Sequence, residues 1–492
     1  MRGMSTAKTK GEVEQTQTGL LGLFGEEEPA ASAATAQTGA SAQGAPRVMS
    51  PVRNQVELRP VDLDALLMPN HPARTVWAFV QAMDLAPLYA RIKSAGSRGG
   101  APAIDPAILV ALWLWATIDG VGSAREIDRL CERDDVYRWI CGGVGVNYHS
   151  LADLRTEHEG WLDAQLTRSI TSLLDRRLVM LNVVAQDGLR VRAHAKASSF
   201  RRREKLAELH AQAQEQVRAL KRELTEDAGA SARRKQAAVE RAARERQQRL
   251  AAALATMDKL QRKPLPEPKT PKAPKPSKRQ GPGDDPPAGG ASAAGPKPAK
   301  PEPPPRVSTS DPEARVMKMA DGGFRPAFNA QLAVDVQTQL IACVTITNNG
   351  SDMGQMAPMH QELQRRYAST PEHWLADGGF TKLEAIEELT ERGTQPVLPP
   401  PRSRNPDIDR LAPKDSDTPA QAQWRAFMGS EFAKDLYVWR GASVECANAQ
   451  LRRRGLHRFN VCGVVKARAV LLWHALAHNL MRMRSLGIAP AG

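Results

Sequence analysis

Three acidic residues that lie far apart in the chain have the chemistry of a metal site: Asp187, Asp377 and Glu445. Asp187 ends the apolar run LNVVAQDG, which predicts a buried strand, and Asp377 ends a shorter run, HWLADGGF, which leads into a helix. Glu445 lies where the basic segment YVWRGASVECANAQLRRRG is predicted to begin a helix. Acids that converge from rigid elements can hold two cations about 3.5–4 Å apart, as two-metal phosphoryl transfer requires. The three residues therefore predict a site that cuts DNA.

Magnesium is the cation that we expect at such a site, because it prefers carboxylate and water ligands at near-octahedral geometry. One ion would activate water or a 3′-hydroxyl group, and a second would stabilise the leaving oxygen. Three carboxylates leave coordination positions open for the nucleophile and for phosphate oxygens. We expect two Mg²⁺ ions, which Mn²⁺ can replace.

The two aspartates also have simpler interpretations. Asp187 is followed by Gly188, and the pair is consistent with an ordinary turn. The motif ADGGF occurs twice, around Asp321 and around Asp377, but only the second copy follows an apolar run and begins a helix. Asp321 is therefore predicted to lie in a turn. Asp335, in the predicted strand QLAVDVQ, is the main rival of Asp377 for the second position.

Glu445 is predicted to lie just inside a helix that Ser443 caps. Asn448 and Arg452 follow at i+3 and i+7, on the same face, which would present an acid beside a phosphate clamp. A basic run that could neutralise phosphates begins there: Arg452, Arg453, Arg454, His457 and Arg458. The alternative is a solvated helix face.

Histidines and cysteines do not predict a further metal site. His474 and His478 are one helical turn apart but have no third ligand, so we expect them to pack in the core. The five cysteines are odd in number and form no C-x-x-C pair, which indicates reduced thiols in a cytoplasm.

The balance of charge favours a polyanionic partner, because the formal net charge is +14 and the pI is about 9.7. Residues 201–310 carry 25 Lys and Arg against 13 Asp and Glu. Residues 437–492 carry nine basic residues against one acidic residue. A basic linker can be only a solvated spacer, whereas the C-terminal segment has the pattern of a folded region. DNA is therefore the expected partner.

No segment predicts a membrane span or an export signal. The longest apolar run, from Ala107 to Ile118, has twelve residues, whereas a span needs roughly 20. The N-terminus lacks a basic stretch followed by an apolar one. We expect a soluble, cytoplasmic protein with a buried helix at the apolar run.

The chain is predicted to hold an all-α domain followed by an α/β core that an insertion interrupts. Helical periodicity changes to strand periodicity at Leu181. Leucine and valine spacing after residue 200 predicts a helical hairpin or coiled coil, and 15 of the 36 prolines, between residues 264 and 305, predict a flexible linker. The predicted divisions are a disordered tail (1–50), an all-α DNA-binding domain (51–180), the first strands of the core (181–200), a charged helical insertion (201–262), a Pro/Lys-rich linker (263–306) and the rest of the core (307–484).

With the insertion removed, the predicted order of elements is β-β-β-α-β-α-β-α. The strands after LNVVAQDG are FRPAFNAQLAVDVQ, LIACVTITN, HWLAD and QPVLP. This order fits an RNase H-like fold, an α/β fold whose mixed five-stranded sheet carries helices on both faces. The first acid would lie on the first strand, the second just after the fourth strand, and the third on a later helix.

Several segments in this order resemble the bacterial insertion-sequence transposases of the DDE type, and within them the branch called IS-eleven-eighty-two. DPAILVALWLWATIDGVGSAREIDRLC resembles the N-terminal helical domain of that branch, and AQDGLRVRAHAKASSFRR resembles its first-Asp motif. LADGGF resembles the second-Asp motif, and YVWRGASVECANAQLRRRGLHRFNVCG resembles the third-acid block. The resemblance runs from about Val52 to Met483, except for the linker.

The resemblance implies a catalytic, metal-binding triad of Asp187, Asp377 and Glu445. It also implies that Tyr437, Arg440 and Arg452 contact the transposon end, as in the Tyr-Arg-Glu-Lys signature of the wider group. Two departures from that signature stand here: one extra residue separates Arg440 from Glu445, and Arg452 replaces the lysine. Arginine can hold phosphate with two hydrogen bonds. The full set expected to bind DNA is Tyr437, Arg440, Asn448, Arg452, Arg453 and Arg454.

The hypothesis that follows is a transposase that binds the terminal inverted repeats of its element, cuts their 3′ ends and joins them to target DNA. The N-terminal helices would recognise the ends, and the helical insertion would support dimerisation. A homodimer is expected in the complex, because two ends must be held together. Three alternatives remain: a catalytically inactive, transposase-derived repressor, a coiled-coil scaffold, and an RNase H-like nuclease that does not transpose.

Overall fold

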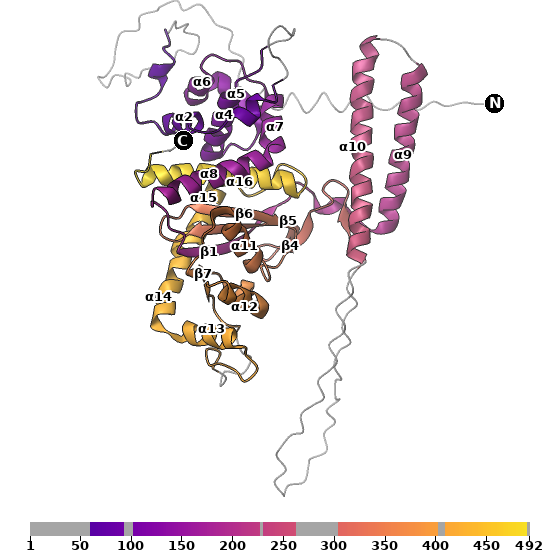
Figure 1. Ribbon diagram of the computed structural model, residues 1–492. Coiled ribbons are helices and arrows are strands. Elements are labelled where there is room, and N and C mark those ends of the chain that lie inside the picture. The colour runs from indigo at the N-terminus through magenta and orange to yellow at the C-terminus, as the bar shows by residue number, and fades with distance from the viewer. Residues whose placement is uncertain (1–59, 93–101, 227–229, 262–303, 402–408, 490–492) are drawn as a thin grey trace, which may run out of the picture. The chain divides into compact units, whose positions relative to one another are not determined.

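The computed structural model describes residues 60–92, 102–226, 230–261, 304–401 and 409–489, and all of these except Pro60 belong to one compact unit. The predicted tail at 1–50 and most of the predicted Pro/Lys-rich linker lie outside the described residues. Figure 1 shows the arrangement of the described elements.

The described N-terminal part is helical, as predicted, and its centre is the apolar helix α4. Asp105 begins α4 by accepting a hydrogen bond from the Ala107 amide (2.8 Å), and Gly120 ends it with a left-handed backbone (φ 82°). No single helix of the described chain is long and apolar enough to cross a membrane; α4 and α5 would be so only as a pair bent by 97°. The elements are η1 (Asp64–Leu66), α2 (Pro72–Gln81), α3 (Ala86–Tyr89), α4 (Pro106–Asp119), α5 (Ala124–Arg133), α6 (Asp135–Cys141), α7 (Tyr148–Glu157) and α8 (Glu159–Asp175).

A mixed sheet follows, and its strand order is that of an RNase H-like fold, as predicted. The central strand β1 pairs with β5 antiparallel and with β7 parallel. Beyond β5 lie β6 and the short β4, which pair with different parts of β5, and beyond β7 lies β8, which is parallel to it. The strands are β1 (Val183–Arg192), β4 (Arg315–Lys318), β5 (Phe324–Asp335), β6 (Ile341–Thr347), β7 (His373–Leu375) and β8 (Gln395–Val397).

Helices from the second half of the chain accompany these strands. The predicted helices after the third and fourth strands are present as α11 and α12. The elements are α11 (Met356–Tyr367), η3 (Gly378–Phe380), α12 (Leu383–Glu391), α13 (Pro419–Gly429), α14 (Glu431–Arg440), η4 (Gly441–Glu445), α15 (Cys446–Arg453) and α16 (Val464–Ser485).

Helix α16 joins the N-terminal helices to the sheet, and it lies between them in Figure 1. It packs against α4, α7 and α8 and also against β6. The Asn479 amide exchanges two hydrogen bonds of 2.8 Å with the backbone of Ile341 in β6, and Arg468 pairs with Asp163 of α8 (2.6 Å). His474 and His478 are buried along it, which confirms that they pack in the core. The helices and the sheet therefore share one hydrophobic core.

The predicted helical insertion is a hairpin of two long helices, α9 (Arg203–Glu226) and α10 (Ala230–Gln261). Leu206 of α9 and Leu250 and Met257 of α10 are buried together, and Val307 of the short strand β3 (Val307–Ser308) joins them. Strand β3 pairs with β2 (Phe200–Arg201), so the two ends of the insertion meet.

Candidate active site

Asp187 lies in the middle of β1 and not at its end. The prediction of a turn at Asp187 and Gly188 is wrong, because the strand continues without a break to Arg192. Burial raises the pKa of the Asp187 carboxyl to about 6; the Gly188 amide and the charge of Arg440 oppose this rise, and the charge of Asp377 adds to it. A carboxylate with such a pKa stays mostly ionised at pH 7 but is held in an environment that favours a cation beside it.

Gly188 is required by a close packing partner, and not by a turn. A Cβ atom at this position would lie 2.1 Å from Oδ1 of Asp352, so the Asp352 side chain lies directly over the backbone next to Asp187. The charge of Asp352 also contributes to the raised pKa of Asp187, whose largest cause is burial. Asp352 is a fourth acid near the site, which the sequence analysis did not single out.

The Asp352 carboxylate is held by three donors from neighbouring strands. Asn329 and Gln331 of β5 donate to its Oδ1 (2.7 and 2.8 Å), and Arg190 of β1 donates to its Oδ2 (3.0 Å). A carboxylate that is satisfied in this way is fixed in place. Its position in the polar segment GSDMGQM, after the third strand of the fold, was the only signal in the sequence.

Asp377 lies immediately beyond the short strand β7, at the position that was predicted. Ala185 of β1 and Leu375 of β7 are paired residues of adjacent parallel strands. Asp187 and Asp377 each follow their paired residue by two positions, so the sheet brings the two carboxylates to neighbouring positions. Oδ1 of Asp377 accepts a hydrogen bond from the Gly379 amide (2.8 Å), which orients the carboxylate at the start of η3.

Asp335, the rival of Asp377, and Asp321, in the other copy of the ADGGF motif, lie elsewhere. Asp335 is buried at the end of β5, where its Oδ2 accepts hydrogen bonds from the amide (2.8 Å) and hydroxyl (2.6 Å) of Thr338 and holds the turn into β6. Asp321 lies in the exposed turn between β4 and β5 and pairs with Arg325 (2.6 Å), which confirms the predicted turn.

Glu445 lies in the middle of a long helix, so the prediction that Ser443 caps its start is wrong. Helices α14 and α15 are joined by η4, a π-helical turn, and the backbone stays helical from Glu431 to Arg453. The residue that begins the helix is Ser430, whose side chain accepts a hydrogen bond from the Ala433 amide (3.2 Å).

The Arg440 guanidinium lies among the three predicted triad carboxylates. It forms an ion pair with Glu445, and its own pKa is raised, against the effect of burial, by the charges of Tyr437, Asp187, Glu445 and Asp377. Its centre lies 5.7 Å from that of the Tyr437 ring, in cation–π contact. The structure thus brings together five residues that the sequence analysis named.

Asn448 connects the helix to β1. Its amide Nδ2 donates to Oδ2 of Asp187 (2.8 Å), whereas its buried Oδ1 has no hydrogen-bond partner. A buried oxygen without a hydrogen bond is unfavourable unless it binds a cation or accepts a hydrogen bond from water. The donor set of three carboxylates and this amide oxygen consists of hard oxygens and fits Mg²⁺. Among the described residues, no three acidic, histidine or cysteine side chains are arranged as ligands of one metal ion.

The basic run after Glu445 divides into exposed and buried members. Arg452 and Arg453 are exposed. Arg454 is only partly exposed, its guanidinium lies 3.5 Å from Nδ1 of His478, and burial lowers its pKa. Arg452 and Arg453 are therefore accessible to a partner, whereas Arg454 is turned toward α16.

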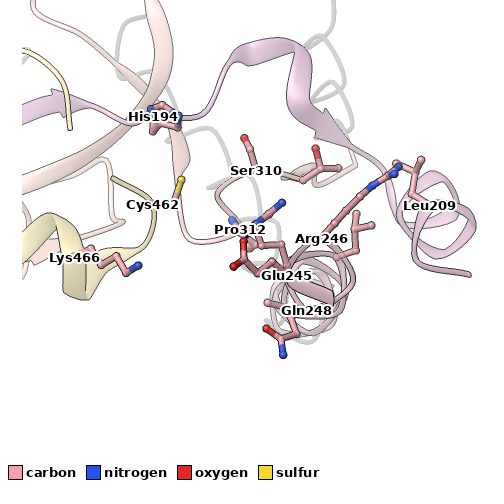
Figure 2. A pocket seen from close by; sticks show the side chains of 13 residues that line it. His194, Leu209, Glu245, Arg246, Gln248, Ser310, Pro312, Cys462 and Lys466 are labelled. Carbon is pink, nitrogen blue, oxygen red and sulfur yellow. Dashed lines mark ion pairs between the residues drawn. The ribbon is translucent and has the colours of Figure 1, made fainter. Parts of the chain in front are cut away.

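A basic groove lies apart from the three acids. It has a volume of about 980 Å³, and Figure 2 shows that it is lined by His194 just after β1, by α10, by the loop at Ser310 and by the start of α16. The cations Arg246, Arg249 and Lys466 line it together with the single acid Glu245. It is a basic groove, and its His194, Glu245 and Cys462 are not among any described group arranged to hold a metal ion.

The strand order and the neighbouring positions of Asp187 and Asp377 define an RNase H-like catalytic domain. Residues 303–480 match the family model described as a transposase DDE domain, and residues 61–157 match a second model, described as a transposase domain. Together the two segments cover more than half of the chain, which belongs to the DDE transposases of insertion sequences. No curated protein and no solved structure matches the chain. The matches do not distinguish a branch of the family, and Asp187 lies between the two matched segments.

Proposed function

We propose that this transposase binds the terminal inverted repeats of its insertion sequence, cuts their 3′ ends and transfers them to target DNA. The observation that carries the proposal is the meeting of Asp187 and Asp377 on adjacent parallel strands with Glu445 from a helix. Asn448 links that helix to Asp187 directly. The same acids would serve both steps, because cleavage and strand transfer are both in-line displacements at phosphorus.

Asp187, Asp377 and Glu445 would hold Mg²⁺, with the unpaired Oδ1 of Asn448 as a further oxygen beside Asp187. Bound Mg²⁺ lowers the pKa of water and neutralises charge on phosphate oxygens. The chain itself excludes water around Asp187 through burial and orients Asp377 through the Gly379 amide. Two ions are proposed because attacking and leaving oxygens both need stabilisation.

The cations around the acids would hold the transposon end. Arg440 and Tyr437 lie at the acids, and the exposed Arg452 and Arg453 follow on the same helix. Such cations position the phosphate backbone without reading its sequence. The N-terminal helices are proposed to read the repeat, and the protein is proposed to act as a homodimer that holds two ends together.

The experiment that tests this function is Mg²⁺-dependent nicking of a duplex that carries the inverted repeats flanking the gene. The repeated motif ADGGF supplies a matched control, because Asp377→Asn changes the acid beside Asp187 and Asp321→Asn changes the same residue in an exposed turn. We expect nicking at the repeat ends by the wild type and by Asp321→Asn, but not by Asp377→Asn. Repeat binding without nicking by the wild type would instead support the repressor.

A further inference from the structure

The long helix that carries Glu445 changes its type beside the acids. Arg440 and Glu445 are five residues apart, and at 3.6 residues per turn they would lie about 140° apart around an α-helix. The π-helical turn η4 stacks residues five apart on the same side. The ion pair between Arg440 and Glu445 depends on this turn.

The turn also aligns the residues on either side of it. Tyr437 precedes Arg440 by three positions, and Asn448 follows Glu445 by three, so each pair shares a face of its own α-helical segment. The π-helical turn merges the two faces into one. In a continuous α-helix without the π-helical turn, Tyr437 and Arg440 would lie on a different face from Glu445 and from Asn448, which donates to Asp187.

Two side chains donate hydrogen bonds to backbone carbonyls at the π-helical turn. The Ser443 hydroxyl donates to the carbonyls of Trp439 (2.7 Å) and Arg440 (3.2 Å). The Gln339 amide, from the turn between β5 and β6, donates to the carbonyl of Ala442 (2.9 Å). The second bond ties the helix to the sheet at the level of η4.

Gln339 is held rigidly for this contact. Its backbone has a left-handed conformation (φ 60°), which residues other than glycine rarely adopt. The backbone amide of Gln339 donates to the backbone carbonyl of Asp335 (2.8 Å). The backbone carbonyl of Gln339 lies 2.9 Å from Nε2 of His478 in α16. Strained backbone persists where the surrounding structure over-determines it.

We propose that Gln339 and Ser443 are positioning residues, which hold the π-helical turn so that Tyr437, Arg440, Glu445 and Asn448 face one point. The kinetic part of this proposal rests on the proposed cleavage function, whereas its geometric part does not. Neither residue carries charge or needs to touch DNA, and both act through the helix.

The first test compares Gln339→Gly with Ala368→Gly, in the nicking assay described above. Both substitutions relieve a left-handed backbone (φ 60° and 46°), but Ala368 lies at the end of α11, whereas the Gln339 side chain donates to the carbonyl of Ala442 in η4. We expect Gln339→Gly to lower kcat about tenfold with an unchanged or higher Tm and little change in KM for the repeat. Ala368→Gly should match the wild type. Wild-type kcat for Gln339→Gly would overturn the proposal.

The second test is rescue by a deletion. Removing Ala442 places Arg440 and Glu445 four residues apart, where an ordinary α-helix brings them together and the support of Gln339 is no longer needed. We expect this deletion to retain nicking and to restore it in the Gln339→Gly background. Deletion of Ala449, an equally exposed alanine in the α-helical part of the same helix, should abolish nicking. Equal loss in both deletions would contradict the proposal.

Crystal structures separate failure of this inference from failure of the proposed function. If the wild type does not cut DNA, the structures still show whether Gln339 holds the π-helical turn. In Gln339→Gly we expect Arg440 and Glu445 to separate, and in the Ala442 deletion we expect them to stay paired. An unchanged π-helical turn in Gln339→Gly would refute the role of Gln339, whatever the protein does to DNA.

Discussion

The pentapeptide ADGGF occurs twice in this chain, and the two copies have opposite surroundings. Around Asp321 it forms the exposed turn between β4 and β5, and Phe324 is 69% exposed. Around Asp377 it follows β7, and Phe380 is fully buried. Identical local sequence therefore gives a solvated turn in one place and a proposed metal ligand in the other. The difference comes from the neighbouring parallel strand β1, which brings Asp187 beside Asp377.

The largest difference between the two copies is expected in catalysis. Asp377→Asn should lower the nicking rate by about a thousandfold or more, because removal of one member of a catalytic unit disables the unit. Asp321→Asn should leave the rate within about twofold, since surface changes have small effects. Single-turnover nicking with labelled repeat DNA measures both. A comparable loss in the two variants would show that the copies are not distinguished by their surroundings.

The next difference is expected in stability. Phe380→Ala removes a fully buried ring and should cost about 3–5 kcal/mol. Phe324→Ala should change the free energy of unfolding by no more than about 0.5 kcal/mol, because its ring is mostly exposed. Urea unfolding followed by tryptophan fluorescence measures these values. Similar costs would place the ring of Phe324 in a core.

The two surroundings also predict different responses to pH. Burial raises the pKa of Asp187 to about 6, whereas the Gly323 amide and Arg325 lower that of Asp321. Between pH 3.8 and 6 the folded protein binds more protons at Asp187 than the unfolded chain, so without metal its stability falls as pH rises through this window. Mg²⁺ should reverse this loss.

At Mg²⁺ concentrations below saturation we therefore expect nicking to fall about tenfold per pH unit below pH 6, because a proton on Asp187 competes with the cation. The rise in Tm on adding Mg²⁺ should be larger at pH 7 than at pH 5. Asp321→Asn should leave both profiles unchanged. A rate that stays level from pH 7 to pH 5 would contradict the assignment of Asp187.

The smallest difference is expected at the fourth residue of the motif. A Cβ atom at Gly379 would lie 2.9 Å from Oδ1 of Asp377, so Gly379→Ala should displace that carboxylate. We expect nicking to fall several-fold with little change in Tm. At Gly323 the new atom would meet mainly the flexible side chain of Arg325 (3.1 Å), so Gly323→Ala should leave nicking unchanged. Equal rates in both variants would show that Asp377 tolerates the shift.

The order of strands and helices in the core was predictable, because the apolar runs LNVVAQDG, LIACVTITN and HWLAD are long or clearly bounded. The place of Asp187 in the middle of its strand was not predictable from the sequence. An Asp-Gly pair is typical of turns, and the glycine is explained by the side chains of Asp352 and Gln331, which are remote in sequence. Such a contact has no local signature.

The predicted start of the helix that carries Glu445, at Ser443, lies too far along the chain. Gly441 and Ser443 have the composition of a helix start, but the chain is already helical from Glu431. The extra residue between Arg440 and Glu445 made the role of Arg440 uncertain in the sequence. The π-helical turn accommodates that residue and gives the spacing a physical explanation.

The insertion after β1 also bears on how the protein is made. Gln186 of β1 and Gln331 of β5 are hydrogen-bonded side chains that lie 145 residues apart. At about 5–20 residues per second, the ribosome needs roughly 7 to 30 s to supply the partner of the central strand. During this wait β1 is an unpaired apolar edge, which is the kind of segment that aggregates. The α9 and α10 hairpin buries its apolar residues mainly against itself, so it can fold before β5 emerges.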